Sequence, residues 1–235
     1  MPIPLIIAHR GDSSNALENS LEAFRLALAV PADMIELDLR MSRDGGLYVM
    51  HDRQTGRTAD PDIDIEGATA RDLAGVRLRN GEPIPSFDDV VRLCAGKVRI
   101  NIEVKSDGAG TALSRHLQQA DLLAPVVVSS FMESEVRNLR AALPGIACAV
   151  IYDTFSPRLI AGYRSKGYSL ISLRKNTVTE PLVAACHGEE IGIYVWTVDK
   201  EDEMQRCIEW GVDGIYTNKP AQLRDLLKKA RATGS

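Results

Sequence analysis

Two histidines in the first part of the chain are the side chains best suited to proton transfer. His9 comes directly after an apolar run, and His51 comes two residues after the apolar run at residues 47–49. An imidazole gains or loses its charge near neutral pH, so this pair can supply a general acid and a general base. The other two histidines, His116 and His187, fall in polar, helix-like surroundings and are expected at the surface.

Two further segments place charged side chains two residues apart within apolar runs: Glu36 with Asp38, and Glu103 with Lys105. Side chains alternate along a strand, so each pair is expected on one face. Buried charges are costly unless they neutralise one another or bind an ion. Three carboxylates without a Cys or His ligand pattern favour one hard cation, Mg²⁺ or Ca²⁺, whereas Lys105 and Arg10 suit a phosphate anion. The alternative is a purely structural ion network among these side chains.

Eight strand-like runs with helical patterns between them predict an α/β fold, a closed (β/α)8 TIM barrel. The strands are expected at residues 5–8, 34–39, 98–104, 126–129, 148–152, 170–173, 193–198 and 214–217. Clear helical patterns cover residues 20–30, 86–95, 111–120 and 133–143. The active site of such a barrel lies at the carboxyl ends of its strands, which is where the charged pairs and His9 occur.

Residues 41–85 interrupt the alternation of strands and helices. A turn signal at residues 42–46 leads at once into the run at 47–49, too soon for a helical crossover. We therefore expect a hairpin over the barrel mouth that delivers His51, followed by an insertion. Its acidic stretch, residues 60–67, can be either a functional cover or a solvated surface loop.

Three polar residues near these segments are candidates for supporting contacts. Asn19 is expected to cap the helix at 20–30, with Glu22 as its capping-box partner, and this role alone would explain it. Glu18 and Asn19 are also possible partners of the site. Asp52 can orient His51, although sequence neighbours on a strand point in opposite directions.

Taken together and in order, these segments resemble the glycerophosphodiester phosphodiesterase family, relatives of the phosphatidylinositol-specific phospholipase C barrels. The resemblance extends from about residue 5 to residue 220. It is carried by His-Arg-Gly at 9–11, Glu-Asn-Ser at 18–20, Glu-x-Asp at 36–38, His-Asp at 51–52, Glu-x-Lys at 103–105, Trp-Thr-Val at 196–198 and the Gly-Val-Asp-Gly-Ile segment within 211–220.

The resemblance implies a role for each candidate. The metal ligands would be Glu36, Asp38 and Glu103; the substrate-binding residues would be Arg10, Lys105 and Trp196; the catalytic residues would be His9 and His51. Likeness to the phospholipase C barrels favours His9 as the base and His51 as the acid, although the sequence alone leaves the order open. Trp196 would line the pocket beside the glycerol, unless it is an ordinary packing residue.

The implied activity is metal-dependent hydrolysis of glycerophosphodiesters, such as glycerophosphocholine or glycerophosphoethanolamine, to an alcohol and sn-glycerol 3-phosphate. The alternatives are a lysophospholipase D or a cyclic-phosphate-forming lyase on the same barrel, and a non-catalytic binder of phosphorylated metabolites. A phosphosugar isomerase barrel would lack the three-carboxylate site. The sequence specifies neither the alcohol nor the choice between Mg²⁺ and Ca²⁺.

Composition narrows the range of partners. A net charge of −4 disfavours nucleic acid and anionic membrane surfaces, and no apolar run approaches the roughly 20 residues that span a bilayer. The first residues lack the features of a signal peptide, and the four cysteines have no metal-type spacing, as expected of core thiols in a reducing cytoplasm. We expect one cytoplasmic domain over residues 1–235 with a small-molecule substrate. The oligomeric state is not specified.

Overall fold

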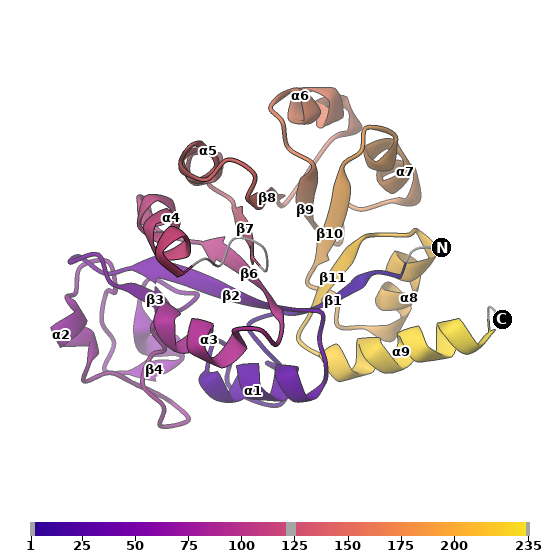
Figure 1. Cartoon of the computed structure of the whole chain (residues 1–235). Helices are drawn as coiled ribbons and strands as arrows, with labels where there is room; N and C mark the ends of the chain where they lie inside the picture. The colour runs from indigo at the N-terminus through magenta and orange to yellow at the C-terminus, as the bar shows by residue number, and fades with distance from the viewer. Residues whose placement is uncertain (1–2, 121–125, 234–235) are drawn as a thin grey trace.

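Eight parallel strands close into a barrel in the computed structural model, which describes residues 3–120 and 126–233 (Figure 1). The strands are β1 (Leu5–Ala8), β2 (Met34–Met41), β6 (Arg99–Val104), β7 (Val126–Ser130), β8 (Ala147–Tyr152), β9 (Leu170–Arg174), β10 (Gly192–Trp196) and β11 (Gly214–Thr217). They pair in the order β1-β11-β10-β9-β8-β7-β6-β2, and β1 pairs with β2 to close the ring. The predicted (β/α)8 barrel is confirmed.

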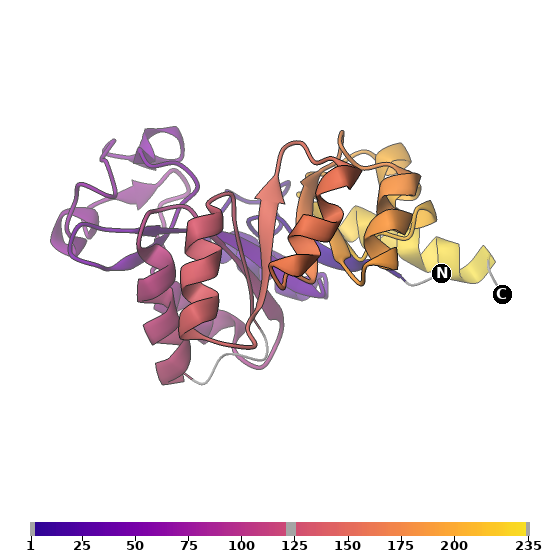
Figure 2. The same ribbon diagram turned by 90° about the horizontal axis from the view of Figure 1, so that it is seen from above.

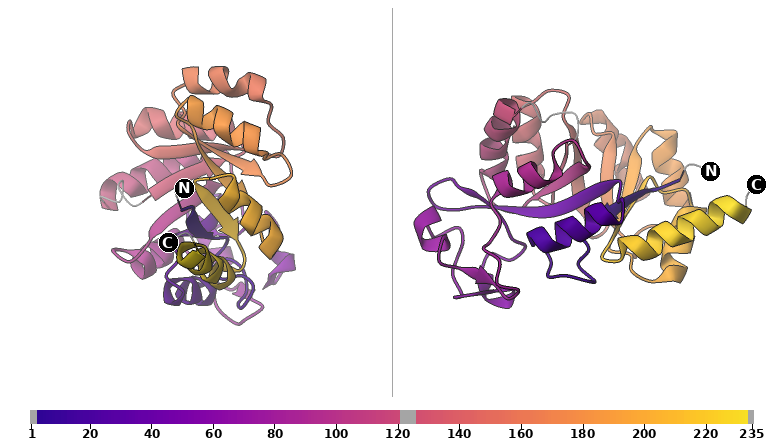
Figure 3. Two further views of the ribbon diagram at one scale, coloured as in Figure 1. Left: turned by 90° about the vertical axis from the view of Figure 1, so that its right-hand side faces the viewer. Right: turned by 60° about the horizontal axis from the view of Figure 1, so that its bottom comes forward.

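Helices cover the outside of the barrel. They are α1 (Leu21–Ala29), α3 (Phe87–Cys94), α4 (Ala109–Ala120), α5 (Glu133–Ala142), α6 (Ile160–Ser165), α7 (Glu180–Gly188), α8 (Glu201–Glu209) and α9 (Pro220–Thr233), with the 3-10 turn η2 (Pro157–Leu159) before α6. Figure 2 shows α4 and α5 packed side by side, and α9 lies beside β1 in both views of Figure 3. All four cysteines are free and buried, three of them in these helices and Cys148 in β8; His187 is exposed, with His116 partly so.

Strand β2 shows how apolar packing directs the charged side chains. Ile35, Leu37 and Leu39 are fully buried against the helical layer, in one cluster with Phe24 of α1. The residues between them must therefore point into the barrel, because successive side chains lie on opposite faces. In the register with β6, Asp38 lies beside Glu103, so carboxylates from two neighbouring strands reach the same level.

The insertion after β2 folds around a small core of its own. It contains β3 (Leu47–Val49), η1 (Thr55–Arg57), β4 (Ala59–Asp60), α2 (Ala70–Leu73) and β5 (Arg77–Leu78). As predicted, β3 pairs antiparallel with β2, and the insertion lies on the side of the barrel away from the exposed end of α9 (Figure 1). The stretch at 60–67 is neither a simple cover nor a free loop, because Ile65 is fully buried in the small core while Asp60 and Asp62 are exposed.

The predicted cap of α1 is wrong by one residue. Ser20 is the N-cap, and its hydroxyl accepts a hydrogen bond from the backbone N–H of Ala23 at 3.0 Å. Asn19 instead adopts a left-handed conformation, with φ of 57°, which asparagine tolerates better than most residues. Its side chain is thereby free to donate to Asp38 Oδ2 at 2.8 Å inside the barrel.

The structure tests two further expectations only over the residues that it describes. Along the described residues, no helix has the length and apolar character needed to cross a membrane. The single domain expected over residues 1–235 includes residues 1, 2, 121–125, 234 and 235, which lie outside the described ranges.

Candidate active site

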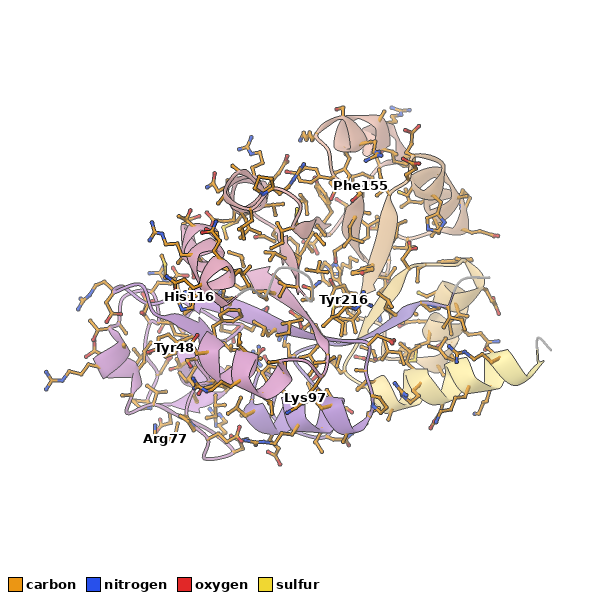
Figure 4. All side chains as sticks on the ribbon, in the orientation of Figure 1. Tyr48, Arg77, Lys97, His116, Phe155 and Tyr216 are labelled. Atoms are coloured by element: carbon orange, nitrogen blue, oxygen red, sulfur yellow. The ribbon has the colours of Figure 1, made fainter. Side chains whose placement is uncertain are left out.

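A pocket opens at the carboxyl ends of the barrel strands and collects the predicted site residues. It is lined by His9, Arg10, Glu36, His51, Glu103, Lys105, Ser129, Phe131, Ile151, Ser172, Trp196, Thr197 and Tyr216. The remaining predicted residue, Asp38, is fully buried and lies with Glu36 and Glu103. Tyr216 lies inside the ring of strands in Figure 4, with its hydroxyl accepting from Asn101 at 2.8 Å.

The three carboxylates converge on one point. Oxygen atoms of Glu36, Asp38 and Glu103 lie within 4.8 Å of one another. Burial and the neighbouring carboxylates raise the pKa of Glu36 well above its ordinary value and that of Glu103 to about 7. Asp38 Oδ1 accepts no hydrogen bond from the residues that the structure describes. A buried acceptor without a donor and two carboxyls that resist ionisation suit a hard divalent cation.

The contacts of the alternative, a structural ion network, are also present. Arg10 Nε lies 3.1 Å from Asp38 Oδ2, and Lys105 Nζ lies 2.7 Å from Glu103 Oε1 and 3.5 Å from Asp38 Oδ1. Burial opposes ionisation of Asp38, but the two cations outweigh it and lower its pKa. When all three carboxylates are ionised, these two cations leave one negative charge in excess, so the network alone neutralises the cluster only if one carboxyl, such as that of Glu36, stays protonated.

The His-Arg-Gly turn presents Arg10 to this cluster. Arg10 has φ of 57°, and its backbone N–H donates to Glu36 Oε2 at 2.8 Å. Gly11 follows with φ of 85°, and a Cβ there would lie 2.7 Å from Cβ of Ala23 in α1. Only glycine therefore fits the turn. The Arg10 guanidinium lies between Asp38 and Glu18, whose Oε1 is 2.8 Å from Nη1.

His9 is held by a chain of two polar residues that the sequence analysis did not identify. Its Nδ1 lies 2.8 Å from Asn218 Oδ1, and Asn218 Nδ2 donates to Asp199 Oδ2 at 2.7 Å. Because an ionised carboxylate only accepts, Asp199 fixes the amide so that Oδ1 faces His9. Nδ1 must then carry the proton, and Nε2 is left as an acceptor. Burial and the charge of Arg10 lower the pKa of His9 to about 4, so the ring is neutral at neutral pH.

His51 is supported by its sequence neighbour. Its Nδ1 lies 2.6 Å from Asp52 Oδ1, so the argument that Asp52 would point elsewhere was wrong. Strand β3 ends at Val49, and alternation no longer applies at residues 50–52. The carbonyl of His51 accepts from Arg40 Nε and Nη2 at 2.9 and 2.7 Å. Burial lowers the pKa of His51, while Asp38 and Asp52 oppose that shift.

Aromatic side chains form the other wall of the pocket. Trp196 and Phe131 meet edge to face, with ring centroids 5.6 Å apart. Trp196 Nε1 is buried and has no hydrogen-bond acceptor among the described residues. A buried N–H usually finds a partner, so this donor is suited to an oxygen atom of a ligand.

Sequence comparisons with known proteins match one family of enzymes. A sequence model described as the glycerophosphoryl diester phosphodiesterase family matches residues 9–222. The chain is 33% identical to a glycerophosphodiester phosphodiesterase of Caldanaerobacter subterraneus subsp. tengcongensis, over 96% of this chain and 98% of that protein. It is 30% identical to one of Bacillus altitudinis, over 92% and 94% of the two chains.

Solved structures agree on the fold. The structure of a glycerophosphodiester phosphodiesterase of Thermotoga maritima has a TM-score of 0.82 at 26% identity and covers 94% of this chain and 98% of its own. An Oleispira antarctica phosphodiesterase, solved in complex with the product sn-glycerol-3-phosphate, has a TM-score of 0.89 at 21% identity, with 96% and 97% covered.

Proposed function

The chain belongs to the glycerophosphoryl diester phosphodiesterase family of enzymes, and on that premise we propose that it hydrolyses glycerophosphodiesters such as glycerophosphocholine or glycerophosphoethanolamine to an alcohol and sn-glycerol 3-phosphate. The observation that carries the proposal is a buried three-carboxylate cluster flanked by two cationic side chains and two histidines in one pocket. The product bound in the Oleispira antarctica phosphodiesterase is consistent with this substrate class.

One Mg²⁺ or Ca²⁺ ion would be held by Glu36, Asp38 and Glu103, and it would supply positive charge that polarises a phosphoryl oxygen. With Arg10 and Lys105 opposite the three carboxylates, a divalent cation turns the excess of one negative charge into an excess of one positive charge. That charge matches a phosphodiester anion. Arg10 would donate to the phosphate from the part of its guanidinium that Asp38 and Glu18 do not occupy, and Lys105 supplies a point charge.

The two histidines are proposed to move the protons. His9 has an unprotonated Nε2 and would accept a proton from the nucleophile, which is water or the neighbouring glycerol hydroxyl. His51 would donate a proton to the departing alkoxide. Burial lowers the pKa of His51, the Asp52 carboxylate opposes that shift, and the negative charge of a bound diester would oppose it further and favour the imidazolium form. Trp196 would donate its free N–H to an oxygen of the glycerol group.

Product analysis tests this proposal. Glycerophosphocholine and glycerophosphoethanolamine are incubated with the protein in Mg²⁺, Ca²⁺ or EDTA, and the products are followed by ³¹P NMR. We expect sn-glycerol 3-phosphate as the phosphorus product and loss of turnover in EDTA. A cyclic glycerophosphate as the end product would favour the lyase alternative, and binding without turnover under every metal condition would favour the non-catalytic binder.

A further inference from the structure

The insertion supplies a guanidinium that contacts two carboxylates at once, that of Arg57. Its Nη1 and Nη2 lie 2.8 and 2.6 Å from the two oxygens of Glu18, in a bidentate pair. Its Nε donates to Asp52 Oδ2. Arg57 does not line the pocket, and its side chain is 48% exposed, so any effect on the reaction must pass through these two partners.

Each partner of Arg57 holds a different side chain of the proposed machinery. The second oxygen of Asp52 lies 2.6 Å from His51 Nδ1. Glu18 Oε1 lies 2.8 Å from Arg10 Nη1. Five side chains are therefore connected in series, from the imidazole that would protonate the leaving group to the guanidinium that would bind the phosphate.

Hydrogen bonds within the insertion fix the backbone that carries Arg57. Arg57 is the last residue of η1, and its carbonyl accepts from Arg79 Nε at 2.9 Å. The first residue of η1, Thr55, is fully buried, and its hydroxyl donates to the Pro61 carbonyl at 2.8 Å. The small core of the insertion thus sets the place of Arg57, and Arg57 in turn sets the two carboxylates.

We infer that Arg57 is a positioning residue that holds His51 and Arg10 in one fixed relative geometry through Asp52 and Glu18, an inference that rests on the roles proposed for His51 and Arg10. Neutralised by Arg57, Asp52 stays an acceptor for the Nδ1 proton, which leaves His51 Nε2 to face the leaving oxygen. Glu18 holds Nη1 of Arg10, which would direct the remaining donors of the guanidinium to the phosphate. The insertion is then part of the catalytic apparatus.

The test uses two substrates that differ in the need for a general acid. Glycerophosphoethanolamine releases a basic alkoxide, whereas the p-nitrophenyl ester of glycerol 3-phosphate releases a phenolate that leaves without a proton. Arg57→Gln cannot bridge both carboxylates, and we expect kcat on the alkyl ester to fall by about 10- to 100-fold, the usual loss for a residue that only orients the acting group. The loss on the aryl ester should be smaller, because that substrate responds only to the displacement of Arg10. Arg57→Lys, which keeps the charge but not the fork, should fall between Arg57→Gln and the unaltered protein.

Arg77→Gln is the matched control. Arg77 also belongs to the insertion, but its guanidinium donates to the backbone carbonyls of Ala74 and Val76, and it lies at the edge of the molecule (Figure 4). It should leave both substrates unaffected. Equal losses on the two substrates in Arg57→Gln, or rates like those of Arg77→Gln, would overturn the inference.

His51→Ala in the same assay separates the inference from the proposed function. We expect it to lose turnover of the alkyl ester and to retain most turnover of the aryl ester. If His51→Ala shows no preference for the aryl ester, the proposed acid role of His51 is wrong. If His51→Ala shows it and Arg57→Gln does not, only the role of Arg57 is wrong.

Discussion

Among single residues, Glu103 should make cation binding by the proposed site depend on pH, together with Glu36, whose pKa is also raised. A carboxyl whose pKa is about 7 is largely protonated in mild acid and ionised above neutrality. Cations bind only the ionised form, so affinity should increase as the pH rises through about 7. We expect Mg²⁺ or Ca²⁺ to bind at least about tenfold more weakly at about pH 5.5 than at about pH 8, as measured by isothermal titration calorimetry.

Glu103→Gln provides the control for that titration. The variant should bind the cation more weakly at about pH 8, and its affinity should depend less on pH because one titrating carboxyl is gone. Some pH dependence should remain, because the pKa of Glu36 is still raised. Affinity that is constant over this pH range and the same in both proteins would show that the three carboxylates do not hold the ion.

Replacement of Lys105 tests whether this side chain binds the phosphate anion in the same pocket. Lys105→Met keeps most of the aliphatic stem but removes the ammonium, so inhibition by sn-glycerol 3-phosphate should weaken about 10-fold, as for the loss of a charge-assisted hydrogen bond. Lys97→Met is the matched control, because Lys97 donates to the Leu93 carbonyl on the outside of the barrel (Figure 4). An unchanged inhibition constant in Lys105→Met, with a lowered melting temperature, would favour a purely structural ion network.

The histidine pair can be assigned by its leaving-group dependence. His9→Ala and His51→Ala should each lose roughly 10²–10⁴-fold in turnover of alkyl esters. Only the variant that lacks the acid should recover on a p-nitrophenyl ester, and we expect that variant to be His51→Ala. Recovery of His9→Ala instead would reverse the two roles.

At the level of elements, the sequence pattern located the barrel strands closely because these strands are buried on both faces and are therefore short, nearly continuous apolar runs. The predicted runs at 5–8, 47–49 and 214–217 coincide with β1, β3 and β11. The alternation of side chains along a strand correctly placed Glu36 and Asp38 of β2 on one face. The predictions that failed concern positions outside regular strands, such as Asn19, where a single left-handed residue shifts the helix cap.

Contacts between distant segments could not be read from local patterns. Asn218 lies 209 positions from His9, and Arg57 lies 39 positions from Glu18. No local periodicity signals such a pair. The one available sign is that Asn218 and Asp199 each follow a barrel strand closely, where parallel strands bring polar side chains to one rim.

Gly11 connects the first strand to the site, and its replacement should affect both stability and activity. Gly11→Ala forces a Cβ against Ala23 at a positive φ, which should cost about 1–3 kcal/mol and displace Arg10. Gly162→Ala is the control, because Gly162 lies in α6 with open space around it. Thermal melting and turnover measure the two effects, and a Gly11→Ala protein as active and stable as Gly162→Ala would contradict this role of the turn.

Across the whole molecule, we propose that the barrel and the insertion at 41–85 form one domain. Strand β3 belongs to both, since it pairs with β2 and begins the insertion. Ion pairs also join them: Arg40 lies 2.7 Å from Glu66, and Arg57 holds Glu18. Units that share a strand and a buried site are expected to unfold together.

A substitution in the small core of the insertion tests that cooperativity. Ile65 is fully buried there, so Ile65→Ala should cost about 2–5 kcal/mol. Both tryptophans, Trp196 and Trp210, lie in the barrel, so their fluorescence reports barrel unfolding. If the molecule is one cooperative unit, Ile65→Ala should lower the melting temperature of the fluorescence transition by several degrees.

Leu159→Ala is the control, because it removes the same number of atoms at a surface position that is 53% exposed. It should leave the melting temperature of the fluorescence transition unchanged. A fluorescence transition that does not move in Ile65→Ala, while circular dichroism shows an earlier loss of structure, would mean that the insertion melts on its own and that the barrel does not depend on it.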